Sequence, residues 1–425
     1  MKAIVDCNNF YCSCERLFQP ALDQKPVVVL SNNDGCIISR SDEAKKLGIE
    51  MAGPYFMARP LIEKHGVTVF SSNYNLYGDL SWRVMETLRH LLGPKNVEVY
   101  SVDEAFLDLN AYHPDELPAL ALRLRETVEQ WTGIKVSVGI APTKVLAKLA
   151  NRLAKKNKSK TNCITLLDTE EKIIRALQQT PVSDIWGVGW QYAEKLRNWS
   201  IFDGLQLRNI SEEFARTHLG GVVGVRLVRE LRGQPSNEME APLTAKKMIA
   251  TTRMFGSPVN DINAIKEAVA TYTSRAAEKL RRQQGAARMI SVFVVAKEES
   301  HSTNFRGATL GNHITLPAAT AFTHELIKPA VELVEKLYQH GTWYKKAGVM
   351  LSGIVPDTSI QGNLFAAESK NSERRLMDMI DNVNFSQRDD VLKFAASGTI
   401  RNWKMRQELR SPRYTTRWTE LFTVS

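Results

Sequence analysis

Two neighbouring carboxylates give this chain its strongest chemical signal. Asp103 and Glu104 follow the β-prone residues 97–100, and a third carboxylate, Asp6, ends a second β-prone run at residues 3–6. Carboxylates held close together raise each other's pKa unless a positive charge lies between them. If the two strands are neighbours in one sheet, the three side chains form an oxygen-rich cluster that suits Mg²⁺. The alternative is an acidic pair on the protein surface, which needs no metal.

Metal ions in such a cluster would point to phosphoryl transfer. A metal pair activates the attacking oxygen and stabilises the leaving oxygen of an in-line displacement. A helix predicted over residues 143–156 carries basic side chains opposite its apolar face, and these form either a solvated surface or a surface for an anionic partner. The basic residues are Lys144, Lys148, Arg152 and Lys155.

Length, charge and cysteine usage narrow the class of protein. A chain of 425 residues predicts two to four domains. A net charge of +10 is typical of nucleic-acid-binding proteins, although other proteins share it. The five cysteines are odd in number and lack zinc-ligand spacing, which predicts reduced thiols. The sequence has no secretory or membrane-spanning apolar run, so we expect a soluble, cytoplasmic protein.

The elements that must hold these groups alternate between strands and helices up to about residue 165. Buried strands are predicted at residues 27–30 and 135–140 from their β-branched, apolar content. Amphipathic helices are predicted at residues 41–47, 76–92 and 117–131.

A small helical section is predicted from residue 166 to about residue 233. It contains Gly187 and Gly189 between two helical stretches, a pattern that resembles the helix-hairpin-helix module. Glycines at such a turn let backbone N–H groups approach a DNA phosphate. An ordinary turn of a helical bundle is the alternative interpretation.

A second α/β section follows a polar linker. The predicted order over residues 247–354 is β-α-β-β-α-β, which is typical of a split ferredoxin-like unit. Thr251 and Arg253 lie on its first strand among basic and hydroxyl residues. They either face a DNA backbone or belong to an α/β sandwich that binds no ligand.

The C-terminal part combines a short motif with a basic, aromatic tail. Gln361, Leu364 and Phe365 form the pattern Q-x-x-L-F, which resembles the bacterial clamp-binding peptide. An apolar anchor onto the preceding domain is the alternative. Aromatic and arginine residues alternate over residues 401–418, which predicts a surface for nucleic acid or a partner protein.

Together these motifs resemble the Y-family translesion DNA polymerases over essentially the whole chain. Residues 6–15 (DCNNFYCSCE) resemble the first family motif and residues 101–106 (SVDEAF) the second. Residues 138–141 (VGIA), with the lysines that follow them, resemble the third. Residues 30–36 and 411–417 resemble the UmuC branch of the family in particular.

The resemblance implies an α+β, multidomain right-hand polymerase fold. It has a ferredoxin-like palm, small fingers, a helical thumb with a helix-hairpin-helix, a β-α-β-β-α-β little finger and a C-terminal segment that binds the clamp and partners. The implied bounds are residues 1–10 and 75–165 for the palm, 11–74 for the fingers, 166–233 for the thumb, 243–354 for the little finger and 355–425 for the C-terminal segment.

The resemblance also implies a role for each motif residue. Asp6 and Asp103 would bind two Mg²⁺ ions with the backbone carbonyl of Cys7, and Glu104 would complete the catalytic site beside Asp103. Tyr11 would exclude a ribose 2′-OH, or else it is a core aromatic residue. The nucleotide pocket would contain Phe10, Tyr11, Arg40, Lys45 and Lys155.

The fingers depart from the family pattern. Many members carry Tyr and Arg on the helix that clamps the triphosphate, where this chain has Asp42 and Lys45. A carboxylate would repel phosphate, so we expect Lys45, assisted by Arg40, to make the contact. Because lysine offers a point charge rather than a bidentate fork, weaker nucleotide binding is predicted.

The implied activity is template-directed, error-prone translesion synthesis in SOS mutagenesis, without a proofreading exonuclease. The implied partners are primer–template DNA, dNTP, a processed UmuD-type subunit, a RecA-type recombinase filament and the sliding clamp, in a nucleoid-associated location. Two alternatives stay open: a nucleotide cyclase with a related palm, and a DNA-bound scaffold with a decayed active site. The second α/β section argues against a cyclase, and the acidic triad argues against a scaffold.

Overall fold

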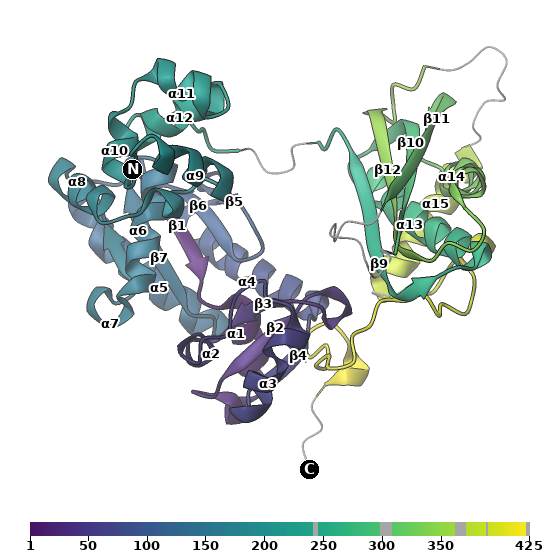
Figure 1. Cartoon of the computed structure of the whole chain (residues 1–425), viewed down its shortest axis with the longest axis horizontal. Helices are drawn as coiled ribbons and strands as arrows, with labels where there is room; N and C mark the ends of the chain where they lie inside the picture. Colours follow the sequence, from purple (N-terminus) through teal and green to yellow (C-terminus); the bar gives the residue numbers. More distant parts are fainter. Residues whose placement is uncertain (241–244, 298–307, 362–370, 388–389, 422–425) are drawn as a thin grey trace.

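The computed structural model describes residues 1–240, 245–297, 308–361, 371–387 and 390–421. These residues form two lobes (Figure 1). The N-terminal lobe, residues 1–240, holds a five-stranded sheet, a three-stranded sheet and a group of helices, and the C-terminal lobe, from residue 245, holds a four-stranded sheet. All five cysteines are free thiols. Within the described part of the chain, no helix has the length and apolar character needed to cross a lipid bilayer.

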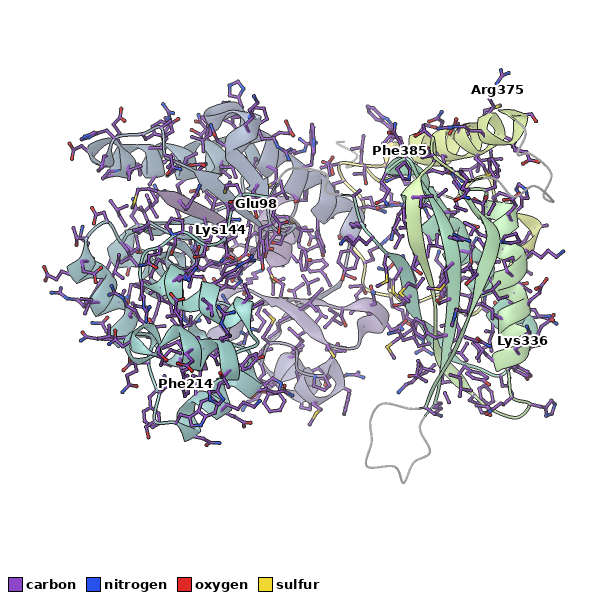
Figure 2. All side chains as sticks on the ribbon, turned by 90° about the horizontal axis from the view of Figure 1, so that it is seen from above. Glu98, Lys144, Phe214, Lys336, Arg375 and Phe385 are labelled. Carbon is purple, nitrogen blue, oxygen red and sulfur yellow. The ribbon has the colours of Figure 1, made fainter. Side chains whose placement is uncertain are left out.

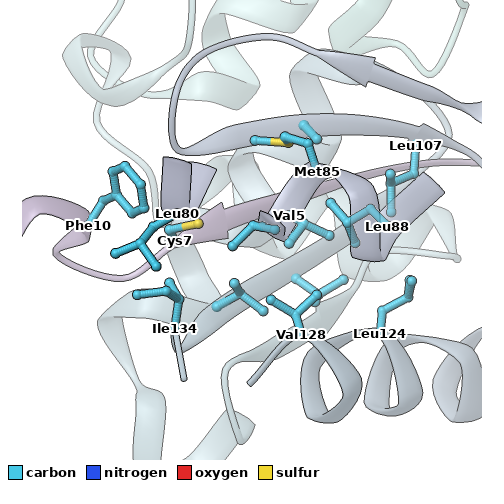
Figure 3. Close-up of a cluster of buried hydrophobic side chains, with 14 of the residues drawn as sticks. Val5, Cys7, Phe10, Leu80, Met85, Leu88, Leu107, Leu124, Val128 and Ile134 are labelled. Atoms are coloured by element: carbon cyan, nitrogen blue, oxygen red, sulfur yellow. The ribbon is translucent and has the colours of Figure 1, made fainter. Parts of the chain in front are cut away.

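A five-stranded sheet in the order β5-β6-β1-β7-β8 is the centre of the N-terminal lobe. Helices α4 and α5 pack on one face, and Figure 3 shows Val5, Leu88 and Val128 in the core between them. Helix α6 covers the other face. The bounds are β1 Lys2–Cys7, β5 Val97–Val99, β6 Glu104–Asp108, β7 Val136–Ala141, β8 Ile164–Leu166, α4 Tyr74–Leu92, α5 Leu117–Thr132 and α6 Lys144–Lys156.

One glycine decides how closely α6 approaches this sheet. A Cβ atom on Gly139 of β7 would lie 2.2 Å from the Asn151 backbone nitrogen and 2.4 Å from the Ala147 carbonyl oxygen. Such contacts are too short for any side chain, so only glycine fits. Because α6 lies directly on the sheet, its lysines reach the ends of β1 and β6.

A three-stranded sheet in the order β3-β2-β4 forms the second part of this lobe. All four residues of β2 are buried, and Val28 and Leu30 pack against Ile37 and Ile62. The bounds are α1 Phe10–Leu17, β2 Val27–Leu30, β3 Ile37–Arg40, α2 Asp42–Lys46, α3 Tyr55–Lys64 and β4 Thr68–Ser71.

Short helices complete the N-terminal lobe. Gly187 has a φ of 97° and allows the tight turn before α9, and Gly220 and Gly221 also have positive φ where α11 gives way to α12. The bounds are α7 Lys158–Thr161, α8 Glu170–Gln178, α9 Trp190–Asn198, α10 Gly204–Asn209, α11 Glu212–His218 and α12 Val222–Leu231.

The C-terminal lobe confirms the predicted β-α-β-β-α-β order. The sheet order is β11-β10-β12-β9, so β12 separates β9 from β10 and each β-α-β unit is split by a strand of the other. Helices α13 and α14 cover one face of this sheet. The bounds are β9 Ile249–Val259, α13 Ile262–Arg282, β10 Gly285–Ala296, β11 Thr309–Thr320, α14 Thr323–Leu337 and β12 Tyr344–Pro356.

The end of the chain differs from its sequence-based expectation. Helix α15, Asn371–Gln387, was not predicted. In the tail, which we define as residues 403–421, Trp403 and Tyr414 are buried against other parts of this chain rather than displayed to a partner. The expectation of a free aromatic surface is therefore wrong for these two residues, whereas Trp418 is exposed.

Candidate active site

The end of the five-stranded sheet brings together the carboxylates singled out from the sequence. Strands β1 and β6 pair antiparallel, with Asp6 opposite Glu104. The Cys7 backbone N–H donates a 2.8 Å hydrogen bond to the Asp103 carbonyl oxygen. The Asp103 carboxylate is held by its neighbour, because the Ser101 hydroxyl donates a 2.6 Å hydrogen bond to its Oδ1. All three carboxylates therefore lie on two adjacent strand ends.

Two lysines of α6 neutralise this cluster. Lys148 Nζ lies 2.7 Å from Glu104 Oε1, and Lys155 forms an ion pair with Asp6. Burial raises the pKa of Asp6 to about 7, against the attraction of Lys155. Burial also acts on Glu104, but hydrogen bonds from Asp6 and Lys148 outweigh it and lower the pKa of that carboxyl group. The two neighbouring carboxyl groups therefore have pKa values shifted in opposite directions.

The donor set fits Mg²⁺. Carboxylates and the Cys7 carbonyl are hard oxygen ligands, and a cation would reverse the raised pKa of the buried Asp6 carboxyl group. The described side chains of Asp6, Asp103 and Glu104 do not all bring ligand atoms within 4.8 Å of one another. One oxygen of each carboxylate is already engaged, by Ser101 at Asp103, by Lys148 at Glu104 and by Lys155 at Asp6.

Tyr11 belongs to an aromatic stack beside this site. Its ring stacks on Tyr77 with centroids 4.6 Å apart, and it meets Tyr74 edge-on at 6.1 Å. Burial raises the pKa of Tyr11 to about 12, so its hydroxyl stays protonated. Phe10 is only 4% exposed and packs near Leu80 in the core (Figure 3). Phe10 is therefore a core residue next to Tyr11, and its place in a nucleotide pocket stays a prediction.

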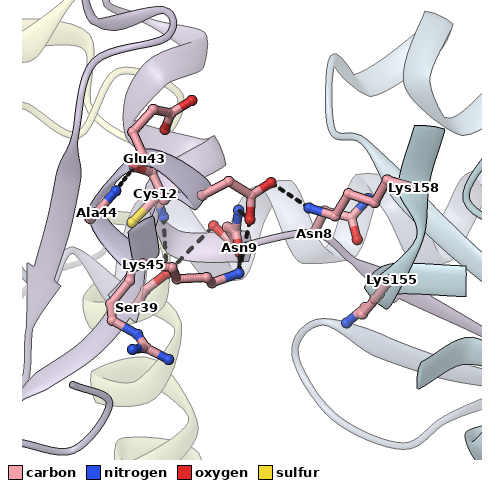
Figure 4. Close-up of polar contacts among 12 residues, drawn as sticks. Asn8, Asn9, Cys12, Ser39, Glu43, Ala44, Lys45, Lys155 and Lys158 are labelled. Atoms are coloured by element: carbon pink, nitrogen blue, oxygen red, sulfur yellow. Dashed lines mark hydrogen bonds and ion pairs between the residues drawn. The ribbon is translucent and has the colours of Figure 1, made fainter. Parts of the chain in front are cut away.

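The Asp42 carboxylate is not free: it is paired with two lysines and holds their ammonium groups in place. It accepts hydrogen bonds from Asn9 Nδ2 at 3.1 Å, from Lys45 Nζ at 3.0 Å and from Lys158 (Figure 4). Burial works to raise the pKa of Asp42, but the hydrogen bonds from Lys158, Asn9 and Lys45 prevail and lower it. Lys158 was not singled out from the sequence, although the basic run at residues 155–160 was an available signal.

Two basic residues that were expected to face an anion instead bind to groups of the protein itself. The Arg40 guanidinium donates to the Ile49 carbonyl oxygen, so it does not assist Lys45 in this structure. Lys144 is buried and lies 2.6 Å from the Glu98 carboxylate, and Figure 2 shows the two side chains together inside the lobe. The basic face of α6 therefore begins at Lys148.

A cavity of about 570 Å³ opens beside the carboxylates. Asp6, Lys148, Lys155 and Trp186 are among the residues that line it. The Lys148 ammonium group lies 4.8 Å from the Tyr100 ring centroid and 5.6 Å from that of Trp186, which holds the cation at the wall. A cavity with carboxylates and ammonium groups in contact suits a metal-bound polyphosphate.

The residues predicted to contact DNA are dispersed. Gly187 and Gly189 lie at the turn before α9, as the hairpin interpretation requires. Thr251 is 7% exposed and lies on the buried face of β9 together with Ile249, and a DNA contact by this residue stays a prediction. Arg253 is exposed, but it lines a cavity of about 530 Å³ between α13 and the tail.

The expected clamp motif is only partly visible. Gln361 is exposed, at the end of the segment that follows β12. Leu364 and Phe365 lie outside the residues that the structure describes.

Family models match most of the chain. A model described as the impB/mucB/samB family matches residues 5–152, and one described as the C-terminal domain of that family matches residues 246–364. A third, described as a domain of unknown function, matches residues 374–424 and so includes α15 and the tail.

Curated proteins and solved structures agree with this match. The chain is 41% identical to Protein UmuC of Salmonella typhimurium over 100% of both chains, and 39% identical to Protein ImpB of the same species over 99% of both. It is 30% identical to DNA polymerase IV of Staphylococcus epidermidis over 68% of this chain and 79% of that protein. A Y-family DNA polymerase chimera of Dbh and Dpo4 has a TM-score of 0.68 at 20% identity, over 84% of this chain and 99% of the chimera, which supports the fold.

Proposed function

The chain belongs to the impB/mucB/samB family, and we propose that it is a Y-family, template-directed and lesion-tolerant DNA polymerase. In the proposed reaction the primer 3′-OH attacks the α-phosphate of a dNTP, and pyrophosphate leaves. The observation that carries the proposal is the pairing of Asp6 with Glu104 beneath two lysines of α6. The similarity to DNA polymerase IV of Staphylococcus epidermidis supports the same activity.

The carboxylate cluster would hold the metals of this reaction. Asp6, Asp103, Glu104 and the Cys7 carbonyl would bind two Mg²⁺ ions, which when bound stabilise charge on the attacking and leaving oxygens. The α6 lysines neutralise the same carboxylates without a metal. When they give up these carboxylates, their ammonium groups can contact the triphosphate. The exchange keeps the buried charge nearly balanced at each stage.

The nucleotide pocket lies between the carboxylates and α2. Lys45 and Lys158 come from different elements and meet at Asp42, which fixes both ammonium groups where a triphosphate would pass. Tyr11 would lie under the sugar and exclude a 2′-OH. Its ring is held from behind by Tyr77, so it cannot easily move aside.

The four-stranded sheet would contact DNA through its open face. Strand register and alternation turn Thr252, Ser291, His313 and Lys346 away from α13 and α14. Hydroxyl and basic side chains of this kind bind phosphate without reading sequence. The turn at Gly187 would offer backbone N–H groups to a second stretch of the duplex. Such contacts suit a polymerase that must follow any template.

The wider cellular role is proposed from the similarity to Protein UmuC over the full chain. We extend the proposal to error-prone synthesis in SOS mutagenesis with a processed UmuD-type subunit and a RecA-type filament, in association with the nucleoid. The sliding clamp would bind the Q-x-x-L-F motif that begins at Gln361, which is exposed.

A primer-extension assay tests the activity. The purified chain is incubated with primed template, Mg²⁺ and dNTPs, and template-dependent elongation is the expected result. A cyclic nucleotide formed without primer would indicate a cyclase instead. DNA binding without any product, in the presence of the proposed partners as well, would indicate a scaffold.

A further inference from the structure

The tail is held by both lobes. Trp403 packs in the core of the C-terminal lobe, where it meets Tyr272 edge-on at 5.8 Å and accepts a 3.2 Å hydrogen bond from the Gly256 N–H. Farther along, the Ser71 N–H donates to the Leu409 carbonyl oxygen at 3.0 Å, and the Leu409 N–H donates to the Ser71 hydroxyl at 2.9 Å. In Figure 1 this last part of the chain lies beside β4 of the N-terminal lobe.

Ser411 of the tail is buried against the N-terminal lobe. It is 4% exposed, and Asn73 Nδ2 donates to both its carbonyl and its hydroxyl oxygen at 3.0 Å. The Ser411 hydroxyl donates a 3.0 Å hydrogen bond to Glu15 Oε1. Next to it, the Tyr414 ring stacks on Phe18 with centroids 4.6 Å apart. The tail therefore packs against the N-terminal lobe through several contacts.

Glu15 is a fully buried carboxylate that faces hydroxyl groups instead of a cation. Its Oε1 accepts a 2.6 Å hydrogen bond from the Tyr77 hydroxyl as well as the one from Ser411. Its Oε2 has no hydrogen-bond partner among the described residues. Burial raises the pKa of Glu15 to about 7. A buried, half-satisfied carboxylate lowers stability, so its presence here calls for a role that an apolar residue could not fill.

Tyr77 connects this carboxylate to the nucleotide pocket. Its hydroxyl donates to Glu15, and its ring stacks on Tyr11 at an interplanar angle of 22°. Tyr74, one turn earlier on α4, meets both rings edge-on. Because Tyr77 is buried, its ring cannot turn without disturbing either the hydrogen bond or the stack.

We propose that Glu15 and Ser411 are positioning residues for Tyr11, so that the docked tail sets how strictly the polymerase excludes ribonucleotides. The inference rests on the proposed function. Ser411 and Tyr77 share one carboxylate oxygen, and both donors fix its position. Loss of either donor lets Tyr77, and with it Tyr11, move away from the position that blocks a 2′-OH.

The test compares kcat/KM for a dNTP with that for the matching rNTP in single-nucleotide primer extension by the full chain. Tyr77→Phe keeps the ring and removes the donor, and Ser411→Ala removes the donor from the tail. Each is expected to lower discrimination by about three- to tenfold, the range for one lost hydrogen bond. The change should come mainly from a lower KM for the rNTP, with dNTP kinetics little altered.

Two matched variants separate positioning from general stability. Tyr414→Phe removes another hydroxyl at the same interface, which accepts from Gln19 at 3.3 Å, and should keep wild-type discrimination. Glu15→Gln keeps the acceptor oxygen and should also keep wild-type discrimination. Unchanged discrimination in Tyr77→Phe, or an equal change in Tyr414→Phe, overturns the inference. If Ser411→Ala fails to fold by thermal melting, Tyr77→Phe decides alone. A wild-type chain that extends no primer would instead refute the proposed function.

Discussion

Asp6 and Glu15 belong to one sequence motif, yet the structure gives them opposite surroundings. Burial raises the pKa of both carboxyl groups to about 7. Asp6 lines the cavity and has Lys155 as its partner, whereas Glu15 is enclosed and faces the hydroxyls of Tyr77 and Ser411. Burial alone therefore does not distinguish a metal ligand from a positioning residue. The two carboxylates differ in access and in their partners, because Asp6 lines the cavity beside a lysine and Glu15 is enclosed by hydroxyl groups.

Asp42 adds a third case. It is more exposed than the other two and is surrounded by donors, and its pKa is lowered rather than raised. A carboxylate in such a setting keeps its charge and aligns cations. In the proposed function the three side chains therefore take different roles according to their partners: Asp6 binds metal, Glu15 positions Tyr11, and Asp42 aligns cations.

The largest effect on primer extension is expected at the proposed metal ligands. Asp103→Ala, and likewise Glu104→Ala, should lower primer extension by roughly a thousandfold or more, because the transferred phosphoryl group loses its preorganised charge. DNA affinity measured by fluorescence anisotropy should stay near wild type, since dispersed basic residues support it.

Asp108→Asn is the matched control for that prediction. Asp108 lies at the other end of β6 and pairs with Lys2 at 2.8 Å, away from the site. Its extension rate should stay within about threefold of wild type, as expected for loss of a surface ion pair. If Asp103→Ala extended primers as fast as Asp108→Asn, the assignment of the metal ligands would be wrong.

The carboxylate cluster could be predicted from the sequence far better than the surroundings of Glu15. Asp6 and Asp103 stand in short local motifs at predicted strand ends, and the structure supplies the one missing condition, that these strands are neighbours. The contact of Glu15 with Ser411 joins residues at opposite ends of the chain, and no local periodicity reports such a contact. The burial of Thr251 was not predicted either, because composition alone does not say which face of a strand is buried.

The second prediction concerns Tyr11, which lies between Asp6 and Glu15 in the sequence. Tyr11→Ala should admit ribonucleotides and lower discrimination on the order of a hundredfold, because the ring that blocks the 2′-OH is gone. The deoxynucleotide rate should change much less. Equal losses with both nucleotides and a lower Tm would mean instead that Tyr11 is a core aromatic residue, whose truncation costs a few kcal/mol.

The third prediction uses pH to test the uncompensated carboxylate. The folded pKa of Glu15 lies above its unfolded value, so the stability from this group is fully present below about pH 4.5 and is lost as pH rises through about 7. The nearby titratable groups, Tyr77 and Cys14, have pKa values raised by burial and stay neutral over this range.

Glu15→Gln should therefore gain stability relative to wild type as pH rises from 5 to 8, by up to about 3 kcal/mol in the free energy of unfolding. The difference in Tm between the two proteins at each pH measures this. A constant difference across the range would show that Glu15 has an unshifted pKa, and that an unseen positive charge or water compensates it.

The smallest effect is expected at Asp42. Asp42→Asn keeps the shape but removes the charge that holds Lys45 and Lys158 together, so the KM for dNTP should rise by roughly threefold at low salt, with kcat little changed. Added salt should reduce the difference, because the three groups are partly exposed. Glu43→Gln, on the same helix but paired with Arg16, is the control and should leave KM unchanged. A lower KM in Asp42→Asn would have the opposite meaning: the carboxylate would repel the incoming triphosphate, and Asp42 would weaken nucleotide binding rather than organise it.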